Sequence, residues 1–307
     1  MARRLARFEG SDGRTLKGVV VSPDPGQPRK PVGFVYLPGI VLGALAVHHL
    51  GLKLADRLAE AGYPTCLFDP PGIGESEGDF PAGTHDEVAI WVADGGPVRG
   101  TLDVVDWMRT NFGVERIALI GHCGGALTAI DCVADHEAVS GALLISPPPL
   151  RLEKGKQKIE RPEVADEYFT LYARKLLDPE PWKKLLTGKS DYRTMATVAR
   201  TKVRSLIRSK LGKRPSARQE ESGGDDGRFK PRLVDATRRS LQQKKRLKVV
   251  FGDKDIDLKN FHDFHQTYLA PHVPLVVIED TSHGFTTLEG QTRLVEEVLQ
   301  FADGLTD

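Results

Sequence analysis

The sequence predicts an α/β fold in which helices cover both faces of a mostly parallel central sheet. Apolar runs of strand character alternate with helical segments along most of the chain. Several of these runs, such as residues 32–37, are apolar almost throughout, as expected for strands that are buried on both faces. A sharp glycine-rich turn at residues 121–125 joins one such run directly to a helix. Together these observations favour a doubly covered sheet over an all-helical or all-β protein.

The predicted elements follow one another in a regular order. Strands are predicted from β-branched and aliphatic runs, and helices from apolar residues at helical spacing. The predicted strands are 15–22, 32–37, 64–68, 116–120, 141–145, 247–251 and 275–278. The predicted helices are 49–61, 98–110, 126–134, 261–269 and 288–301. We therefore expect residues 1–149 and 247–307 to form the core of one large domain.

The alternation breaks between residues 150 and 246, where the pattern predicts no convincing strand. Helices are expected there at 162–177, 181–186, 191–211 and 232–246. The stretch 213–230 is polar, charged and glycine-containing, which predicts a mobile loop. We expect residues 150–246 to form a helical cap that is inserted into the core.

Charge is distributed unevenly, although the formal net charge is only +1. Residues 151–246 contain 27 Lys and Arg against 13 Asp and Glu, and the rest of the chain contains 16 against 29. The basic segment is either a solvated face or a docking surface for an acidic partner, such as an acyl carrier protein or coenzyme A. Its basic helix lacks aromatic residues for base stacking, so we do not expect nucleic acid as a partner.

Cysteine usage and the hydropathy pattern suggest a compartment. Three cysteines give no disulfide framework, which suits a reducing environment. The basic residues 1–7 are not followed by the apolar segment of a signal peptide, and no run is long enough to span a bilayer. We therefore expect a cytoplasmic protein.

The turn Gly121-His122-Cys123-Gly124-Gly125 has the form of a nucleophile elbow. Gly121 and Gly125 leave room where a Cβ atom would collide with the neighbouring strand and helix. The helix that begins here would favour a thiolate on Cys123 and would direct the N–H of Gly124 at a developing oxyanion. Cys123 is therefore the candidate nucleophile.

Further motifs follow other predicted strands, and with the elbow they give the chain order nucleophile, acid, histidine. They are Leu37-Pro38-Gly39, residues 69–76, Gly252-Asp253-Lys254-Asp255 and Ser282-His283-Gly284-Phe285. In these features nearly the whole chain resembles the α/β-hydrolase superfamily. The resemblance implies an α/β-hydrolase fold with a cap over the active site. Within the cap, residues 178–189 and the basic helix after them are similar to the hydrolase 1 family associated with the exosortase A system.

The resemblance implies a catalytic role for each matching side chain. Cys123 corresponds to the nucleophile, His283 to the general base and Asp255 to the acid that orients the histidine. Asp253 and Asp257 remain alternatives for the acid. Asp253 could instead be a turn residue, and Asp257 could be a helix N-cap.

The remaining candidate residues surround this triad. The resemblance implies that the backbone N–H groups of Ile40 and Gly124 form the oxyanion hole. His48 and His49 follow the loop on the oxyanion side and His122 adjoins the nucleophile, so these three histidines are candidates for lining the substrate pocket. We expect neither a cofactor nor a metal ion, because the fold needs none.

Cysteine as the nucleophile is the main departure from the superfamily, most of whose members carry serine. A thiolate needs less assistance from a base than an alkoxide and is a good leaving group. We therefore expect an acyl hydrolase or acyltransferase of the (thio)esterase type that forms an acyl-cysteine intermediate from a thioester or ester. Two alternatives stay open: a non-catalytic binding or scaffold protein, and an acyltransferase like the polyhydroxyalkanoate synthases, which also carry a Gly-x-Cys-x-Gly box.

Overall fold

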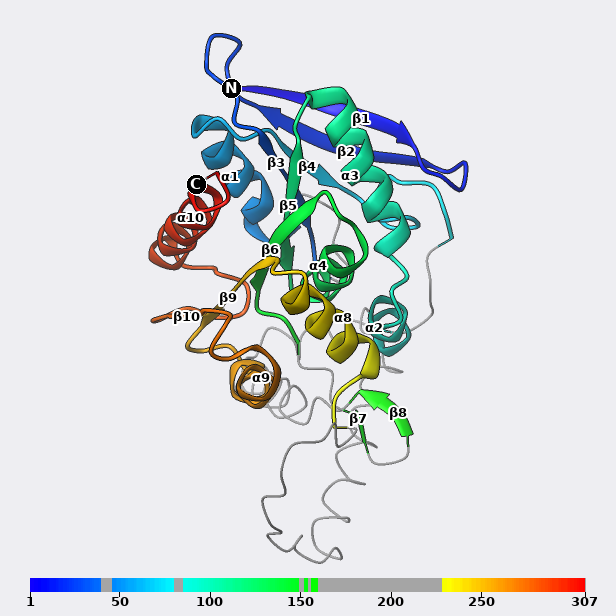
Figure 1. The fold of residues 1–307 in the computed structure, drawn as a ribbon, viewed down its shortest axis with the longest axis vertical. Helices are drawn as coiled ribbons and strands as arrows, with labels where there is room; N and C mark the ends of the chain where they lie inside the picture. Colours follow the sequence, from blue (N-terminus) through cyan, green and yellow to red (C-terminus); the bar gives the residue numbers. More distant parts are fainter. Residues whose placement is uncertain (40–45, 80–84, 149–151, 154–155, 160–227, 307) are drawn as a thin grey trace, which may run out of the picture. The chain divides into compact units, whose positions relative to one another are not determined.

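The computed structural model describes residues 1–39, 46–79, 85–148, 152–153, 156–159 and 228–306. Its centre is an eight-stranded sheet in the order β1-β2-β4-β3-β5-β6-β9-β10 (Figure 1). The strands are β1 (Ala2–Glu9), β2 (Thr15–Ser22), β3 (Val32–Leu37), β4 (Thr65–Phe68), β5 (Arg116–His122), β6 (Val139–Ile145), β9 (Arg246–Gly252) and β10 (Leu275–Ile278). Strand β2 pairs antiparallel with β1 and β4, and every other pairing is parallel. The predicted mostly parallel sheet is confirmed.

Helices pack on both faces of this sheet (Figure 1). They are α1 (Ala46–Glu60), α2 (His85–Ala93), α3 (Val98–Phe112), α4 (Gly124–Asp135), α8 (Pro231–Gln242), α9 (Leu258–Phe264), the π-helical turn η1 (His265–Leu269) and α10 (Leu288–Asp303). Helices α1 and α10 contact each other on one face, whereas α3 and α8 both contact α4 on the other. This is the doubly covered arrangement that the sequence predicts.

Two hydrophobic clusters, one on each face, follow from the alternation of side chains along the buried strands. In β3, Phe34 and Tyr36 belong to the cluster that includes α1 and α10. Their neighbours Val35 and Leu37 belong to the cluster that includes α3, α4 and α8. Because both faces are covered, such strands read as continuous apolar runs rather than as alternating ones.

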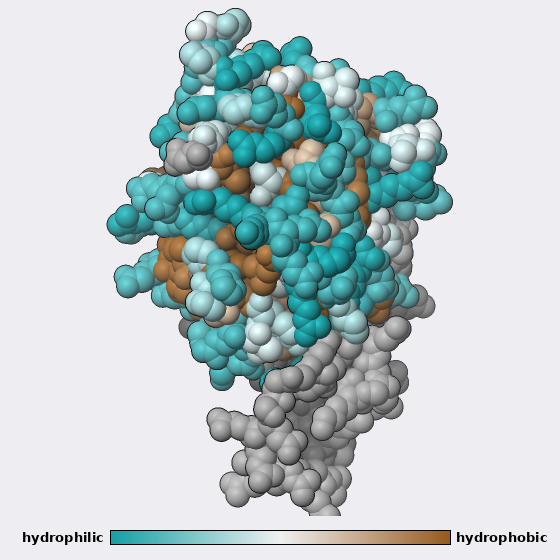
Figure 2. Space-filling view, viewed as in Figure 1, coloured by the Kyte–Doolittle hydropathy of each residue, from teal (hydrophilic) through white to brown (hydrophobic). Residues whose placement is uncertain are grey.

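On the face that Figure 2 shows, hydrophilic side chains predominate among the coloured residues, with several hydrophobic patches between them. Among the described residues, the large hydrophobic side chains that are exposed are Met1, Leu5, Val277 and Leu288. None of the helices in the described part of the chain is long and apolar enough to cross a membrane.

Several elements differ from the expectation. Strand β1 was not predicted, and we read its residues only as a basic segment. Only Ala6 and Phe8 of this edge strand are buried, so its sequence lacks the apolar run of a central strand. Helix α2 was not predicted, and the short strands β7 (Leu152–Glu153) and β8 (Lys156–Ile159) lie where we expected none. The predicted cap helices 162–177, 181–186 and 191–211, and almost all of the loop 213–230, lie outside the described residues.

Helix α8 extends the core beyond the predicted boundary at residue 247. Residues 227–307 form one compact unit with residues 1–160. We expected the helix at 232–246 to be the last helix of the cap. Helix α8 instead packs against α4 of the core, and it ends at Gln242, before β9 begins. Ala236 is fully buried and Leu233 and Val234 are nearly so, which gives the helix an apolar face toward the core.

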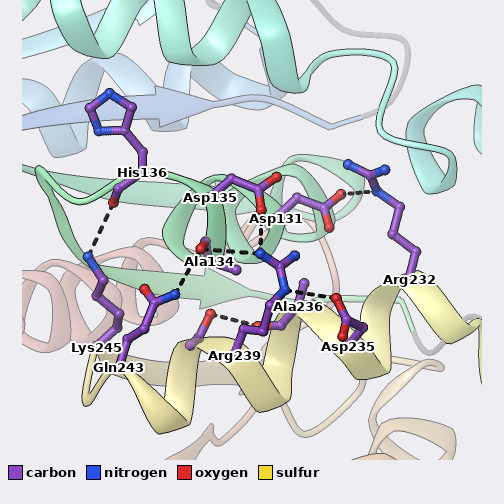
Figure 3. A network of polar contacts seen from close by, with 11 residues as sticks. Asp131, Ala134, Asp135, His136, Arg232, Asp235, Ala236, Arg239, Gln243 and Lys245 are labelled. Carbon is purple, nitrogen blue, oxygen red and sulfur yellow. Dashed lines mark hydrogen bonds and ion pairs between the residues drawn. The ribbon is translucent and has the colours of Figure 1, made fainter.

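Ion pairs add a polar seam between α4 and α8 (Figure 3). Arg232 Nε donates to Asp131 Oδ2 at 2.8 Å, and Arg239 pairs with both Asp135 and Asp235. The Asp131 side chain is only 7% exposed, and this burial raises its pKa to about 6 although Arg232 opposes the shift. The seam thus contains one buried carboxylate, that of Asp131, whose negative charge is balanced mainly by Arg232.

Arg232→Ala is expected to destabilise the protein more than Asp131→Asn does. The first change leaves a buried carboxylate without its ion-pair partner, whereas the second removes the charge that needs compensation. We expect a loss of about 1–3 kcal/mol in the free energy of unfolding for Arg232→Ala, since the arginine is partly exposed. Urea unfolding at pH 7.5 measures both values. A larger loss for Asp131→Asn would contradict this reading of the seam.

Candidate active site

The carboxyl ends of the parallel strands meet at one edge of the sheet and bring the predicted triad together. Cys123 follows β5 directly, and Asp255 lies three residues beyond the end of β9. His283 lies in the loop between β10 and α10. Residues that are far apart in the sequence are therefore placed in one site by the topology alone.

Cys123 occupies a strained backbone position at the turn between β5 and α4. Its φ and ψ are 53° and −120°, a backbone conformation that residues other than glycine rarely adopt. A Cβ atom on Gly121 would lie 2.5 Å from Ala126 Cα, and one on Gly125 would lie 2.3 Å from the Leu37 carbonyl oxygen. Both glycines are thus needed for the close packing of strand, turn and helix, which is the reason the sequence pattern could reveal the turn.

Asp255 and His283 form a hydrogen-bonded pair. His283 Nδ1 lies 3.0 Å from Asp255 Oδ2, and the N–H of Asp257 donates to Asp255 Oδ1 at 2.9 Å. Burial tends to raise the pKa of Asp255, but the hydrogen bonds from His283 and from the N–H of Asp257, together with the charge of His283, lower it overall. The carboxylate is therefore buried, charged and oriented toward the imidazole.

The imidazole of His283 contacts Asp255 and is close enough to Cys123 for the two side chains to influence each other. Burial tends to lower the pKa of His283, but the hydrogen bonds with Asp255 and with the Cys123 side chain outweigh this and raise the pKa to about 11. Such a raised pKa favours the protonated imidazolium form of His283. This arrangement suits a thiolate–imidazolium pair with an orienting carboxylate behind it.

The geometry distinguishes among the three predicted acids. Asp253 is exposed, and its Oδ1 accepts the N–H of Thr281 at 2.9 Å, as expected of a turn residue. Asp257 stands at the N-cap position of α9, but its side chain makes no capping hydrogen bond. Asp255 is the acid whose carboxylate contacts His283 Nδ1.

A group of potential metal ligands overlaps this pair. Among the described residues, ligand atoms of Asp255, Asp257 and His283 lie within 4.8 Å of one another. His283 Nδ1 already contacts Asp255, so a cation here would have to displace the hydrogen bond that orients the imidazole. The arrangement thus serves proton chemistry better than metal binding.

His122, which we predicted to line the substrate pocket, lies beside the site in the described part of the chain. Its side chain is buried, and its ring is centred 5.5 Å from that of His283. Burial and the nearby His283 lower the pKa of His122 to about 4, so the neutral ring can donate from Nε2 to the His283 carbonyl oxygen at 3.0 Å. Nothing in the local sequence indicated this support for the His283 loop, because it depends on a segment 161 positions away.

The other predicted residues contribute less to the described site. His49 is exposed on α1. The His48 side chain and the whole of Ile40 lie outside the described residues. Gly124 begins α4 directly after Cys123, so its N–H belongs to the first turn of that helix.

The buried His122 predicts a defined loss of stability in acid. Its folded pKa of about 4 lies below the value of about 6.5 expected in the unfolded chain, so the stabilisation is complete above pH 6.5 and is lost as the pH falls toward 4. His122→Gln keeps a donor without the titration. Between pH 7 and pH 4 the wild-type unfolding free energy is expected to fall by about 3 kcal/mol more than that of the variant. Denaturant unfolding measures this difference, with His49→Gln as the exposed control. Identical pH dependence of the wild type and His122→Gln would refute the assignment.

A small cleft opens next to the elbow, and the sequence did not predict it. It is partly open, and its enclosed space holds little more than one water molecule. It lies among the loops after β3 and β4 and helices α2, α3 and α4. The lining residues are Leu37, Pro38, Gly39, Pro70, Ile73, Trp91, Val92, Pro97, Thr101, Gly124, Gly125 and Thr128. None of these described residues carries a charged side chain.

Comparisons with known proteins agree with this architecture. The model of the alpha/beta hydrolase family matches residues 34–297. An esterase of Pyrococcus furiosus superposes with a TM-score of 0.63 at 18% identity, covering 100% of this chain and 92% of the esterase. An alpha/beta hydrolase of Penicillium sp. sh18 gives 0.63 at 18% identity, covering 100% and 99%. A serine hydrolase without a lid from Xanthomonas campestris gives 0.56 at 16% identity, covering 100% and 96%.

A search of curated proteins found no matching sequence. The solved structures are too distant in sequence to carry more than the fold. The family model, however, spans most of the chain, including the turn at Cys123 and the loops that carry Asp255 and His283. The chain therefore belongs to the alpha/beta hydrolase family.

Proposed function

We propose that the protein is an acyl hydrolase or acyltransferase that uses Cys123, His283 and Asp255 as its catalytic triad. The observation that carries the proposal is the position of His283, whose Nδ1 lies 3.0 Å from Asp255 Oδ2 and whose pKa is raised by both Asp255 and Cys123. A nucleophile within reach of a base that is itself oriented by a third group is the arrangement of covalent acyl transfer. The strained elbow and the N-terminus of α4 support the same assignment.

In the proposed reaction, the Cys123 thiolate attacks the carbonyl carbon of a thioester or ester and forms a new C–S bond. The oxyanion that develops is stabilised by the N–H of Gly124, and the superfamily resemblance adds the N–H of Ile40. The bond to the leaving group then breaks, and the leaving thiol or alcohol takes its proton from the His283 imidazolium. Neutral His283 next deprotonates water or another acceptor, which attacks the acyl-cysteine and regenerates the thiolate.

Thioesters are the substrates that this chemistry favours. Exchange of an acyl group between two thiols is close to balanced in free energy, so a cysteine nucleophile accepts acyl groups from thioesters readily. The basic segment 151–246 offers a docking surface for an acyl carrier protein or for the phosphates of coenzyme A. The resemblance of residues 178–189 to the exosortase-associated hydrolases lies outside the described residues and stays a prediction.

Intact-protein mass spectrometry after incubation with a panel of acyl thioesters and activated esters tests the proposal. A mass increase equal to the acyl group is expected for the wild type and not for Cys123→Ala. Adding hydroxylamine should remove the adduct, because thioesters are cleaved by this nucleophile. Turnover without any dependence on Cys123 would reject the proposed mechanism, and the absence of both adduct and turnover across the panel would favour a non-catalytic protein on the same fold.

A further inference from the structure

We propose that His122 is a positioning residue of the triad, and that its hydrogen bond to the His283 backbone holds the imidazole of the base toward Cys123. The inference rests on the proposed function and adds a further residue to the same reaction. His122 ends β5 directly before the nucleophile, whereas His283 lies 161 positions later in the loop after β10. One side chain thus joins the segment of the nucleophile to the segment of the base.

The contact between the two histidines is direct and shielded from solvent. His122 Nε2 lies 3.0 Å from the carbonyl oxygen of His283, and only 3% of His122 is exposed. A hydrogen bond that water cannot readily replace resists displacement of its partner. The accepting carbonyl belongs to the same residue whose imidazole moves the proton. A shift of this carbonyl would therefore move the imidazole with it.

Other side chains hold the flanks of the same loop. Gln291 of α10 donates from Nε2 to the Phe285 carbonyl oxygen at 2.8 Å. The N–H of Thr281 donates to a carboxylate of the turn after β9 at 2.9 Å. These two contacts fix the loop on either side of His283, and the bond from His122 fixes the residue between them. The position of the base thus depends on His122 more directly than on the flanking contacts.

The loop also contains a strained backbone position that His122 contacts. Phe285 is fully buried and has a φ of 50°, which residues other than glycine rarely adopt. Its ring meets the His122 ring edge-on, with the centroids 6.4 Å apart. A strained conformation persists only where the surrounding structure determines it. His122 supplies part of these surroundings through its ring as well as through its hydrogen bond.

The charge state of His122 suits this role. Burial and the nearby His283 lower its pKa to about 4, although the carboxylate of Asp255 opposes the shift. The ring of His122 is therefore neutral at neutral pH, and its centroid lies 5.5 Å from that of His283. A second cation at this distance would disfavour the imidazolium form of the base. A neutral donor holds the loop without opposing that charge.

Two substitutions separate the hydrogen bond from the packing of the ring. His122→Leu removes the donor but keeps an apolar side chain of similar bulk. His122→Gln places an amide nitrogen as many bonds from Cβ as Nε2 is in histidine. With a thioester that the wild type turns over, His122→Leu should lower kcat by about 10–100-fold at unchanged KM, because a misplacement of about 1 Å costs up to about 10²-fold. His122→Gln should retain most of the activity.

Alkylation by iodoacetamide tests the same contact without a substrate. Its rate follows the thiolate fraction of Cys123, whereas the other two cysteines are buried. If His283 stabilises the thiolate, the wild type should react at pH 6 nearly as fast as at pH 9, and His283→Ala should react slowly at pH 6. His122→Leu should lower the pH 6 rate by about ten-fold and leave the pH 9 rate unchanged, because its thiol pKa returns toward that of a free cysteine.

His265→Leu is the matched control. His265 Nε2 also bonds a backbone carbonyl, that of Val273 at 2.8 Å, but this contact lies before β10 begins and not at the triad. Its alkylation rates at both pH values should match those of the wild type. His122→Asn carries an amide that is too short to reach the carbonyl, so it should behave like His122→Leu. It replaces that variant if circular dichroism shows that His122→Leu is unfolded.

The outcomes distinguish the positioning role from the triad itself. Wild-type alkylation at pH 6 in folded His122→Leu and His122→Asn would overturn the positioning role and leave the proposed function intact. Equal losses in His122→Gln and His122→Leu would overturn it as well, because the donor would then not be the group that matters. A wild-type rate that is slow at pH 6 and unchanged by His283→Ala would reject both the triad and the role of His122.

Discussion

Cys123→Ala is expected to lower kcat/KM for acyl substrates by roughly 10⁶-fold, the scale found when a nucleophile is removed from an acyl-transfer triad. The variant should keep the backbone N–H of Gly124, because only a side chain is shortened. It should form no covalent adduct, because the His283 imidazole and a bound water cannot replace the thiolate as the first attacking group. Steady-state kinetics with a thioester substrate measure the loss, and the mass of the intact protein reports the missing adduct.

The other two cysteines provide matched controls for this result. Cys66 in β4 and Cys132 in α4 are both fully buried. Burial raises the pKa of the Cys66 thiol to about 12 and that of Cys132 well above its usual value, so neither offers a thiolate near neutral pH. Cys66→Ala and Cys132→Ala should therefore keep both turnover and adduct formation, after a modest loss of stability. Loss of the adduct in either control, with Cys123→Ala still labelled, would place the nucleophile elsewhere.

The sequence alone was sufficient for the elbow because its constraints are local. Gly121, Cys123 and Gly125 lie within five positions, and each glycine is required by a close approach within or beside the same turn. The alternating elements likewise predicted the parallel sheet, because strands buried on both faces have a distinctive composition. Edge strand β1 escaped prediction for the opposite reason, since most of its side chains are exposed.

Features that depend on distant segments could not be predicted in the same way. The support of His283 by His122 joins β5 to the loop after β10. The cleft combines residues from 37 to 128, and its apolar lining is indistinguishable in the sequence from ordinary core. The placement of α8 in the core depends on its contacts with α4, which an amphipathic pattern does not specify. Asp253, Asp255 and Asp257 are only two positions apart in the sequence, so only the structure could show which of them contacts His283.

The choice of Asp255 as the acid can be tested by substitution. Asp255→Asn is expected to lower kcat/KM by about 10²–10⁴-fold. Both carboxylate oxygens of Asp255 accept hydrogen bonds, Oδ2 from His283 Nδ1 and Oδ1 from the N–H of Asp257. An asparagine has one acceptor oxygen, so its NH₂ group would face one of these two donors. The imidazole would then lose its orientation or the loop would lose its turn. In either case the anion that stabilises the imidazolium is lost.

The pH profile distinguishes this electrostatic role from a merely structural one. Hydrogen bonding to Asp255 is one of the causes that raise the pKa of His283 to about 11. Removal of the negative charge lowers the pKa of the imidazolium, so the alkaline decline of kcat/KM should begin at a lower pH in Asp255→Asn. Asp253→Asn is the matched control, because an asparagine there can still accept the N–H of Thr281 from an exposed turn. Its activity and pH profile should stay near those of the wild type. If Asp253→Asn or Asp257→Asn instead lost activity while Asp255→Asn retained it, the acid would have been assigned to the wrong residue.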